Sequence, residues 1–321
     1  MNQTPESRIT EEVSRHLNHT FLGSDTPKPS YRGKVRDVYE KANELFIVAT
    51  DRVSVFDQVV GTIPLKGAML TSQSSFWLKR AQDIIKTHLI EQEDPQIQRC
   101  LKATPFRFEM IVRGFLTGSL LREPAATRGL SYGIRVDPSM GAYEQFASPV
   151  LTPSTKADAG LHDEPITLAH ITDAGLASQR QLDTIRDATL ALFAMGSAFA
   201  KERGLLLVDT KYEFGLCDGE VILIDEIHTA DSSRYWIANS YAQRLAQGLE
   251  PEMLDKERLR RVLIAQGADP KGHSAIPPLT DEMRIDLGKH YWKLTETLTG
   301  EAFAPLEEVA STRLARFDWL S

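Results

Sequence analysis

The sequence predicts an α+β protein with two lobes. Strand-like runs of residues concentrate at 31–49 and 204–227, and each of these regions contains a turn signal. Runs with one apolar face at helical spacing occupy other stretches, chiefly 71–89, 180–203 and 281–298. A chain of 321 residues is long enough for two hydrophobic cores. We expect a β-rich lobe at 1–112 and an α+β lobe at 113–321.

The bulk composition excludes several classes of protein. The chain is 42% hydrophobic and 25% charged, as ordinary globular proteins are. Its net charge of −7 provides no surface-wide attraction for nucleic acid. Two cysteines cannot form a disulfide framework or a cysteine-based zinc site. No apolar run has the length of a membrane span, and the first residues lack the core of a secretory signal. We expect a protein of the reducing cytoplasm.

The N-terminal third contains a basic segment around a glycine. After a predicted helix at 9–22, residues 31–39 alternate as one β-strand would, and a second strand follows at 45–49. Gly33 lies among Arg32, Lys34 and Arg36. A glycine lets backbone N–H groups approach a phosphate closely, and neighbouring cations neutralise its charge. The alternative is a solvated basic strand edge, which is common.

Two further segments concentrate polar groups that could bind an anion. Residues 50–57 contain two acids, an arginine and two hydroxyl side chains. Asp57 is one of the acids, and Ser54 carries one of the hydroxyl groups. A predicted strand at 106–112 leads into a glycine-rich stretch that carries Arg113 and Ser119. A plain glycine-rich turn between strand and helix explains that stretch equally well.

The stretch 129–165 is loop-rich and longer than a purely structural connection. It carries Lys156, His162 and Asp163, where the adjacent His and Asp form either a local turn or a catalytic pair. A hydroxyl-rich turn farther along the chain runs from Asp231 to Arg234 and also suits a phosphate.

The most informative stretch is a predicted hairpin at 204–227. The two-residue period of a strand places Asp209, Lys211 and Glu213 on one face, and Asp225 lies on the second strand. A two-residue loop would send Asp225 to the opposite face, whereas a three-residue loop at 217–219 would place it opposite Lys211. Two carboxylates and a lysine on one face suit a hard cation beside phosphates, and ordinary surface ion pairs are the alternative.

Taken together, these segments resemble the SAICAR synthetase (phosphoribosylaminoimidazole-succinocarboxamide synthase) family. Nine motifs appear in the family's order: GKVRDVY at 33–39, ATDRVSVFD at 49–57, IPLKG at 63–67, VRGFLTGS at 112–119, LTPSTKA at 151–157, HDE at 162–164, LVDTKYEFG at 207–215, IDEI at 224–227 and DSSRYW at 231–236. One such motif is weak evidence, but nine in order make a chance resemblance implausible.

The resemblance implies a kinase-like, ATP-grasping architecture with a small antiparallel β lobe and a larger α+β lobe. It places Gly33, Lys34 and Arg36 over the phosphates of ATP, and Lys211 beside a Mg²⁺ ion that Glu213 and Asp225 hold. If both carboxylates act from strand positions, the hairpin loop must hold an odd number of residues, most simply three.

The same resemblance assigns residues to the substrates. Three match family positions that hold carboxyaminoimidazole ribotide, especially its phosphate: Arg113, Ser119 and Arg234. Six others fall in motifs that line the substrate and L-aspartate pockets: Ser54, Asp57, Lys156, His162, Asp163 and Asp231. The implied reaction is ATP-dependent ligation of L-aspartate to the ribotide's carboxylate through an acyl phosphate, in purine biosynthesis. His162 or Asp163 is the candidate acceptor of the amine proton.

Two other functions fit part of the pattern. A kinase-like phosphotransferase with a hydroxyl acceptor would share the nucleotide machinery, but Arg113 and Arg234 provide anion sites outside it. A non-catalytic nucleotide sensor would not need Lys211, Glu213 and Asp225 together. The expected partners are small molecules only, without nucleic acid or membrane, and a monomer is favoured over an oligomer.

Overall fold

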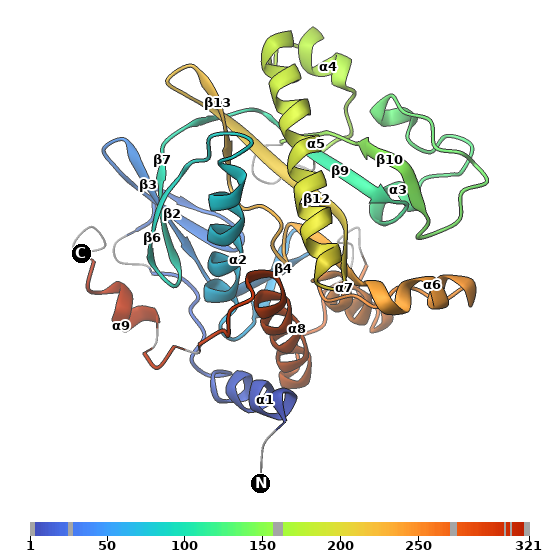
Figure 1. Cartoon of the computed structure of the whole chain (residues 1–321). Helices are drawn as coiled ribbons and strands as arrows, with labels where there is room; N and C mark the ends of the chain where they lie inside the picture. The colour runs from blue at the N-terminus through green and yellow to red at the C-terminus, as the bar shows by residue number, and fades with distance from the viewer. Residues whose placement is uncertain are drawn as a thin grey trace. The chain divides into compact units, whose positions relative to one another are not determined.

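The computed structural model has an α+β fold with antiparallel sheets (Figure 1). The structure describes residues 4–24, 28–156, 163–269, 275–304, 306–308 and 310–317. Within these ranges, no helix is both long and apolar enough to cross a membrane.

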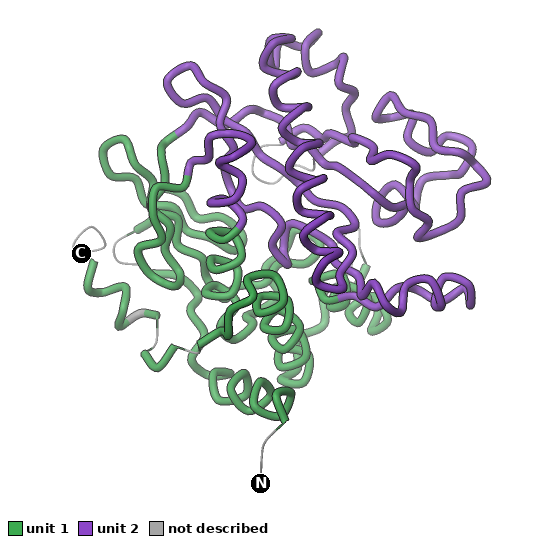
Figure 2. The backbone as a smooth tube through the Cα atoms, viewed as in Figure 1, with its two compact units in different colours: residues 1–76, 89–102, 254–321 green, residues 77–88, 103–253 purple. Residues whose placement is uncertain are grey.

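The chain divides into two compact units, each assembled from separate stretches of sequence (Figure 2). Unit 1 contains residues 1–76, 89–102 and 254–321, and unit 2 contains residues 77–88 and 103–253. The C-terminal residues therefore belong to the same compact unit as the N-terminal strands.

Unit 1 is built on a five-stranded antiparallel sheet. Its strands follow the order β1-β2-β3-β7-β6, with bounds β1 Tyr31–Arg32, β2 Arg36–Lys41, β3 Glu44–Ala49, β6 Leu89–Asp94 and β7 Ile97–Leu101. A separate hairpin pairs β4 Arg52–Val55 with β5 Gln58–Thr62. The sheet's apolar side chains form a core with the C-terminal residues, in which Phe46, Val48 and Ile97 pack with Leu314.

The predicted single strand at 31–39 is wrong. Residues 31–32 and 36–41 are two strands that pair with each other in antiparallel register, with Arg32 opposite Asp37. Residues 33–35 therefore form a tight turn, which the Gly33 N–H closes by donating to the Arg36 carbonyl at 2.8 Å. The basic glycine segment lies at the tip of a short hairpin rather than along a strand.

The helices of unit 1 pack around this sheet and against one another. Their bounds are α1 Pro5–Arg15, α2 Lys66–Ala81, α7 Glu257–Ala265, α8 Asp281–Thr299 and α9 Ala310–Leu314, and the last five residues of α2 belong to unit 2. Helix α1 ends at Arg15 rather than Leu22, and α2 ends at Ala81 rather than Leu89, because residues 89–94 form an edge strand. Gln98 donates to Ser75 at 2.9 Å, which fixes α2 on β7.

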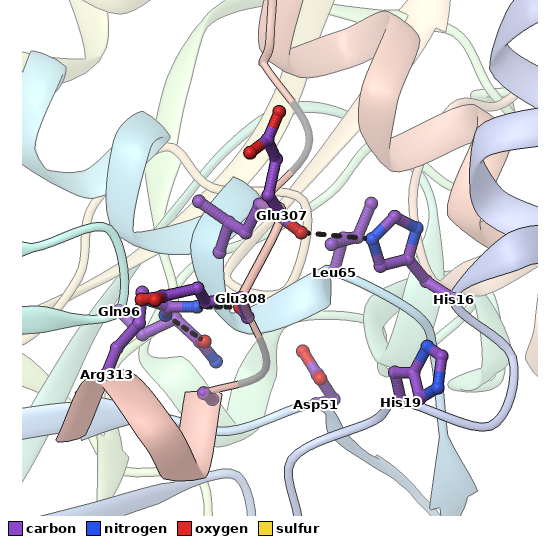
Figure 3. A pocket seen from close by; sticks show the side chains of 10 residues that line it. His16, His19, Asp51, Leu65, Gln96, Glu307, Glu308 and Arg313 are labelled. Atoms are coloured by element: carbon purple, nitrogen blue, oxygen red, sulfur yellow. Dashed lines mark hydrogen bonds between the residues drawn. The ribbon is translucent and has the colours of Figure 1, made fainter. Parts of the chain in front are cut away.

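The C-terminal residues close a small cavity of about 40 Å³ in unit 1 (Figure 3). Arg313 donates to both carboxylate oxygens of Asp94, at 3.0 and 3.1 Å, and to Gln96 at 2.8 Å. Asp51 lies on the cavity's other side, where its oxygens accept the N–H groups of Phe21 and Gly67. Burial raises the pKa of Asp51 from 3.8 to about 6.

Unit 2 is built on a seven-stranded antiparallel sheet. Strands β10, β9, β12 and β13 follow one another across it, β11 also pairs with β9, and β8 and β14 also pair with β12. Their bounds are β8 Thr104–Pro105, β9 Phe108–Phe115, β10 Gln145–Leu151, β11 Ser154–Thr155, β12 Leu205–Cys217, β13 Glu220–Ile224 and β14 Ser233–Ile237. The region predicted as loop thus supplies β10 and β11, which extend the sheet.

A long helix covers one face of this sheet. Helix α5, Gln179–Glu202, packs on β9 and β12 (Figure 1). Its Phe193 ring lies so close to the Gly114 backbone that a Cβ at Gly114 would be 3.1 Å from it. A Ser178–Gln181 capping box begins the helix, and the helix confirms the apolar stripe predicted at 180–203. The remaining helical segments are α3 Gly118–Arg122, a 3-10 turn at Leu130–Tyr132, α4 Leu168–Asp173 and α6 Ala238–Ala246.

The predicted three-residue loop of the β12–β13 hairpin is also wrong. Cys217 pairs with Glu220, so the loop contains only Asp218 and Gly219, both with positive φ as a type I′ turn requires. Glu213 pairs with Ile224, which is the register of the two-residue alternative. The strand ends at Ile224, and Asp225 lies beyond the ladder.

Candidate active site

Strand β12 carries charged side chains on one face at alternate positions, because successive strand residues point to opposite faces. Asp209 pairs with Arg113 of β9, and Lys211 pairs with Ile111 in the same register. Residues directly opposite each other in an antiparallel ladder share a face. Asp209, Lys211 and Glu213 therefore share one face of the sheet with side chains from β9.

Lys211 lies at the centre of a group of carboxylates. Its Nζ lies 2.5 Å from Glu213 Oε1, 2.9 Å from Glu109 Oε1 and 3.9 Å from Asp225 Oδ2. Burial by itself would lower the pKa of Lys211, but the charges of Glu213, Glu109 and Asp225 outweigh it and raise that pKa well above its ordinary value. The ammonium therefore stays protonated, and Lys211 acts as a fixed positive charge rather than as a base.

Asp225 reaches this group by a route that the strand pattern does not predict. Its φ is +66°, in the left-handed region that a non-glycine residue seldom adopts. This conformation interrupts the two-residue alternation, so the argument from strand faces does not apply to Asp225. Strain of this kind costs about 1–3 kcal/mol and tends to be retained at functional sites.

Glu109 is a member of the group that sequence reasoning missed. It lies on β9, and only 8% of its surface is exposed. Its pKa is raised to about 7, chiefly by burial; Lys211 opposes this rise, and the charges of Glu213 and Asp163 add to it. The signal was present in the sequence, because alternation along the predicted strand at 106–112 places Glu109 on the same face as Arg113.

The structure describes two of the three candidate residues predicted in the stretch 129–165. Lys156 Nζ donates to Glu213 Oε2, so Lys156 belongs to the carboxylate group. Asp163 is exposed and lies close enough to Glu109 for its charge to act on that carboxyl. His162 lies outside the residues that the structure describes.

The donor set fits a magnesium ion that keeps other ligands. Glu213 and Asp225 offer carboxylate oxygens that approach the same ammonium, and their side chains are 8% and 18% exposed. Among the residues that the structure describes, no three His, Cys, Asp or Glu side chains form a metal-binding group. Mg²⁺ is typically bound through one or two carboxylates, with waters and substrate phosphates completing the octahedron. The two side chains therefore suit such an ion.

A second group on the same face gathers two arginines around one carboxylate. Asp209 lies between two arginines in the register, Arg113 on β9 and Arg234 on β14. Both guanidinium groups donate to its Oδ2, at 3.2 and 2.6 Å. Asp209 and Arg113 are each only 4% exposed, and burial lowers the pKa of Arg113. Two arginines share one carboxylate, so the group keeps a net positive charge.

Neighbouring residues orient these arginines. Arg113 donates through Nη2 to Ser119 Oγ and through Nε to Thr152 Oγ1, each at 2.9 Å. Gly118 has φ +61°, and a Cβ there would lie 2.9 Å from the Arg234 guanidinium. The structure thus brings the predicted residues Arg113, Ser119 and Arg234 together. Asp209, which the sequence placed on the correct face without a role, connects them.

Asp231 precedes this group in the turn before β14. Its N–H donates to Thr229 Oγ1 at 3.3 Å, and Thr229 Oγ1 donates in turn to Glu226. Asp231 therefore belongs to a hydrogen-bonded turn between the second hairpin strand and Arg234.

The remaining predicted residues lie in unit 1. Lys34, at the tip of the β1–β2 turn, forms a 2.5 Å ion pair with Asp57, and both side chains are more than half exposed. An exposed pair of this kind contributes at most about 1 kcal/mol, so an incoming phosphate can compete for the lysine. Ser54 lies half-buried on β4, and Arg36 begins β2. Asp57 has φ +62°, which marks the β4–β5 turn as strained.

The sequence matches a family model described as SAICAR synthetase over residues 29–274. The chain belongs to the SAICAR synthetase family. It is 43% identical over 281 residues to a putative phosphoribosylaminoimidazole-succinocarboxamide synthase 2 of Mesorhizobium japonicum, a match that covers 86% of this chain and 89% of the relative. It is 36% identical to the chloroplastic enzyme of Arabidopsis thaliana, over 96% of this chain and 76% of that protein.

The fold agrees with this membership. A SAICAR synthase structure from Saccharomyces cerevisiae, complexed with SAICAR, matches with a TM-score of 0.74 and 30% identity, over 89% of this chain and 98% of that one. SAICAR synthetases use ATP to ligate aspartate to carboxyaminoimidazole ribotide in purine biosynthesis, and the chain is an enzyme of this class.

Proposed function

We propose that the chain performs this ligation through an acyl phosphate, with Mg²⁺ held by Glu213 and Asp225. An oxygen of the ribotide's carboxylate attacks the γ-phosphorus of ATP, and ADP leaves. The amine of L-aspartate then attacks the acyl carbon, inorganic phosphate leaves, and the nitrogen loses a proton. The carboxylate oxygen that attacked phosphorus departs with the phosphate.

One observation carries this proposal: the carboxylate group around Lys211 and the arginine group around Asp209 share one face of β12. Asp209 and Lys211 are two positions apart along the strand, a rise of about 7 Å. A substrate with a phosphate at one end and a carboxylate to be phosphorylated at the other fits two such neighbouring groups. A simple phosphotransferase with a hydroxyl acceptor has no use for the arginine group.

A Mg²⁺ ion held by Glu213 and Asp225 would supply positive charge beside the phosphoryl group in transfer, and neutralising that group is the main task in such reactions. Lys211 supports the same task as a permanent positive charge, since neighbouring carboxylates keep its pKa high. The ammonium lies within 2.5 Å of Glu213 and 3.9 Å of Asp225 and balances their charges. It is therefore already at the position where negative charge collects when substrates bind.

The arginine group supports recognition of the ribotide phosphate. Arg113 and Arg234 offer planar donor pairs, which match phosphate oxygens better than lysine does. Asp209 holds both guanidinium groups through Oδ2, and Ser119 and Thr152 hold Arg113 from other sides. Pre-orientation of this kind reduces the entropy lost when the anion binds.

The remaining assignments follow the family pattern. Gly33, Lys34 and Arg36 bind the phosphates of ATP from the β1–β2 turn, and Ser54, Asp57, Lys156 and Asp231 line the substrate and aspartate pockets. Asp163 or His162 accepts the amine proton. The architecture is that of a two-lobed, kinase-like enzyme, and it acts as a monomer on small molecules.

The test is ADP release from ATP and Mg²⁺ with the ribotide, in the presence and absence of L-aspartate. Sustained release that requires both substrates supports the ligase. Release with a hydroxylated acceptor and no aspartate would instead identify a phosphotransferase. No release under any condition would identify a nucleotide sensor, and either of these results overturns the proposal.

A further inference from the structure

The turn at residues 33–35 is held from one side by the segment that enters β4. Arg52 donates from Nη2 to the Gly33 carbonyl and from Nε to the Lys34 carbonyl, each at 3.1 Å. The next carbonyl, that of Val35, accepts both the N–H and the hydroxyl of Thr50, at 3.0 and 2.7 Å. Three successive carbonyl groups of the turn therefore point toward Thr50 and Arg52.

Arg52 is itself fixed in place by a buried carboxylate. It is 6% exposed, and its Nη2 donates to Asp37 Oδ1 at 2.7 Å. Asp37 is fully buried, and Arg52 Nη1 also donates to the Leu22 carbonyl. A Cβ at Gly23 would lie 2.4 Å from Asp37 Oδ2 and 2.8 Å from Arg52 Nη1, so the chain before the turn packs directly on this pair.

The orientation of the carbonyls determines that of the N–H groups. The C=O of one residue and the N–H of the next point in opposite directions across a trans peptide. The N–H groups of Lys34 and Val35 therefore point away from Arg52. Among the residues that the structure describes, neither N–H has a protein acceptor. Two successive N–H groups that point to the same side form a concavity suited to an anion.

We propose that Arg52 is a positioning residue, which orients the N–H groups of Lys34 and Val35 to receive the phosphates of the nucleotide. This inference rests on the proposed function, because it assumes that the turn binds those phosphates. Arg52 touches no phosphate itself, since its donors are directed to Asp37 and to backbone carbonyls. Its effect must therefore appear in nucleotide affinity and not in the affinity for the ribotide or L-aspartate.

The test compares the wild-type enzyme with Arg52→Lys. A lysine keeps the positive charge beside Asp37, but its ammonium cannot reproduce the planar fork that reaches the carboxylate and two carbonyls together. We expect the Kd for ADP to rise about tenfold, the loss expected for one hydrogen bond of ordinary strength. The Kd for adenosine, which has no phosphate, should stay within about twofold of the wild-type value. The KM values for the ribotide and L-aspartate should not change.

Two further variants separate positioning from general damage. Arg99→Lys is the matched control, because Arg99 of the same unit pairs with Glu44 and Glu91 and makes no contact with the turn. It should leave ADP and adenosine affinity unchanged. Asp37→Asn keeps the shape of the acceptor but loses its charge. It should therefore weaken the binding of ADP and leave the binding of adenosine unchanged. It keeps the test informative if Arg52→Lys does not fold.

The wild-type protein provides a measurement that needs no substitution. The backbone amide resonances of Lys34 and Val35 should move on titration with ADP or pyrophosphate, and not with adenosine. Equal losses of affinity for ADP and adenosine in the variants, or amide resonances that do not move, would overturn the inference. The proposed function would stand in that case, provided that the wild-type enzyme retains ligase activity. A wild-type protein that binds no ADP would overturn both the inference and the proposed function.

Discussion

Replacing Gly118 with alanine tests whether the arginine group holds the ribotide phosphate. Gly118 has φ +61°, a conformation that costs a residue with a Cβ about 1–2 kcal/mol. Its new Cβ would lie 2.9 Å from Arg234 Nη1, 3.0 Å from Nη2 and 3.1 Å from Cζ. The guanidinium must therefore move, and its 2.6 Å hydrogen bond to Asp209 lengthens or breaks. A charged hydrogen bond of this kind contributes about 1.5–3 kcal/mol.

The matched control is Gly204→Ala. Gly204 has φ +72° and no atom within 4 Å of an added Cβ, so it carries the same backbone strain without the collision. Backbone strain should cost each variant about 1–2 kcal/mol of unfolding free energy in urea. Gly118→Ala should lose up to about 1.5–3 kcal/mol more, because its Arg234–Asp209 hydrogen bond lengthens or breaks. Only Gly118→Ala should raise the steady-state KM for the ribotide, by at least about tenfold, with the KM for ATP unchanged. Equal ribotide KM values in the two variants, or a rise in the KM for ATP alone, would refute the phosphate assignment.

Three other perturbations test separate parts of the account. Glu213→Gln should weaken the activation of the enzyme by Mg²⁺ more than about tenfold without lowering Tm. The control variant Glu220→Gln, at an exposed position of the same hairpin, should leave Mg²⁺ activation unchanged. Near-normal Mg²⁺ dependence of Glu213→Gln would remove Glu213 from the metal site. Asp209→Asn leaves the buried Arg113 and the partly buried Arg234 without their carboxylate and should cost at least about 3 kcal/mol in urea unfolding; a cost below about 1 kcal/mol would show that the arginine group does not depend on that charge. Asp51 binds its proton up to pH about 6 in the folded state and releases it near 3.8 when unfolded, so its stabilising effect is complete below pH 3.8 and disappears as the pH rises through 6. Relative to Asp51→Asn, the wild-type unfolding free energy should fall by at most about 3 kcal/mol across that range, and parallel stability curves would contradict the shift.

Sequence periodicity located those parts of the site that lie along single strands. The alternation that places Lys211 and Glu213 together is a local property of a chain with a two-residue period, and the structure confirms it. The same alternation extends to Asp209. Pairing between β9 and β12 is not local, because Glu109 and Lys211 are 102 residues apart in sequence. The register that brings them to 2.9 Å depends on the whole sheet.

Asp225 lies near Lys211, as predicted, although the predicted length of the hairpin loop is wrong. The strand argument required a three-residue loop, and the loop has two residues. Asp225 approaches Lys211 because the strand has already ended and its backbone is left-handed. A carboxylate that leaves the ladder cannot be placed by counting residues along it.

The turn at residues 33–35 was missed for a different reason. Gly33 is followed by lysine and valine, which do not form one of the usual turn dipeptides. The turn is stabilised instead by Arg52, which is 19 residues away from Gly33 in sequence. Local propensity therefore favoured a continuous strand, and a distant guanidinium determined the observed conformation.

The central claim is that the ribotide carboxylate becomes an acyl phosphate. The most direct measurement uses a ribotide labelled with ¹⁸O in both carboxylate oxygens and follows the label by mass spectrometry of the products. An acyl phosphate places one ¹⁸O atom in each inorganic phosphate released and one in the amide of the product. Inorganic phosphate without label, with ADP and product formed normally, would contradict it.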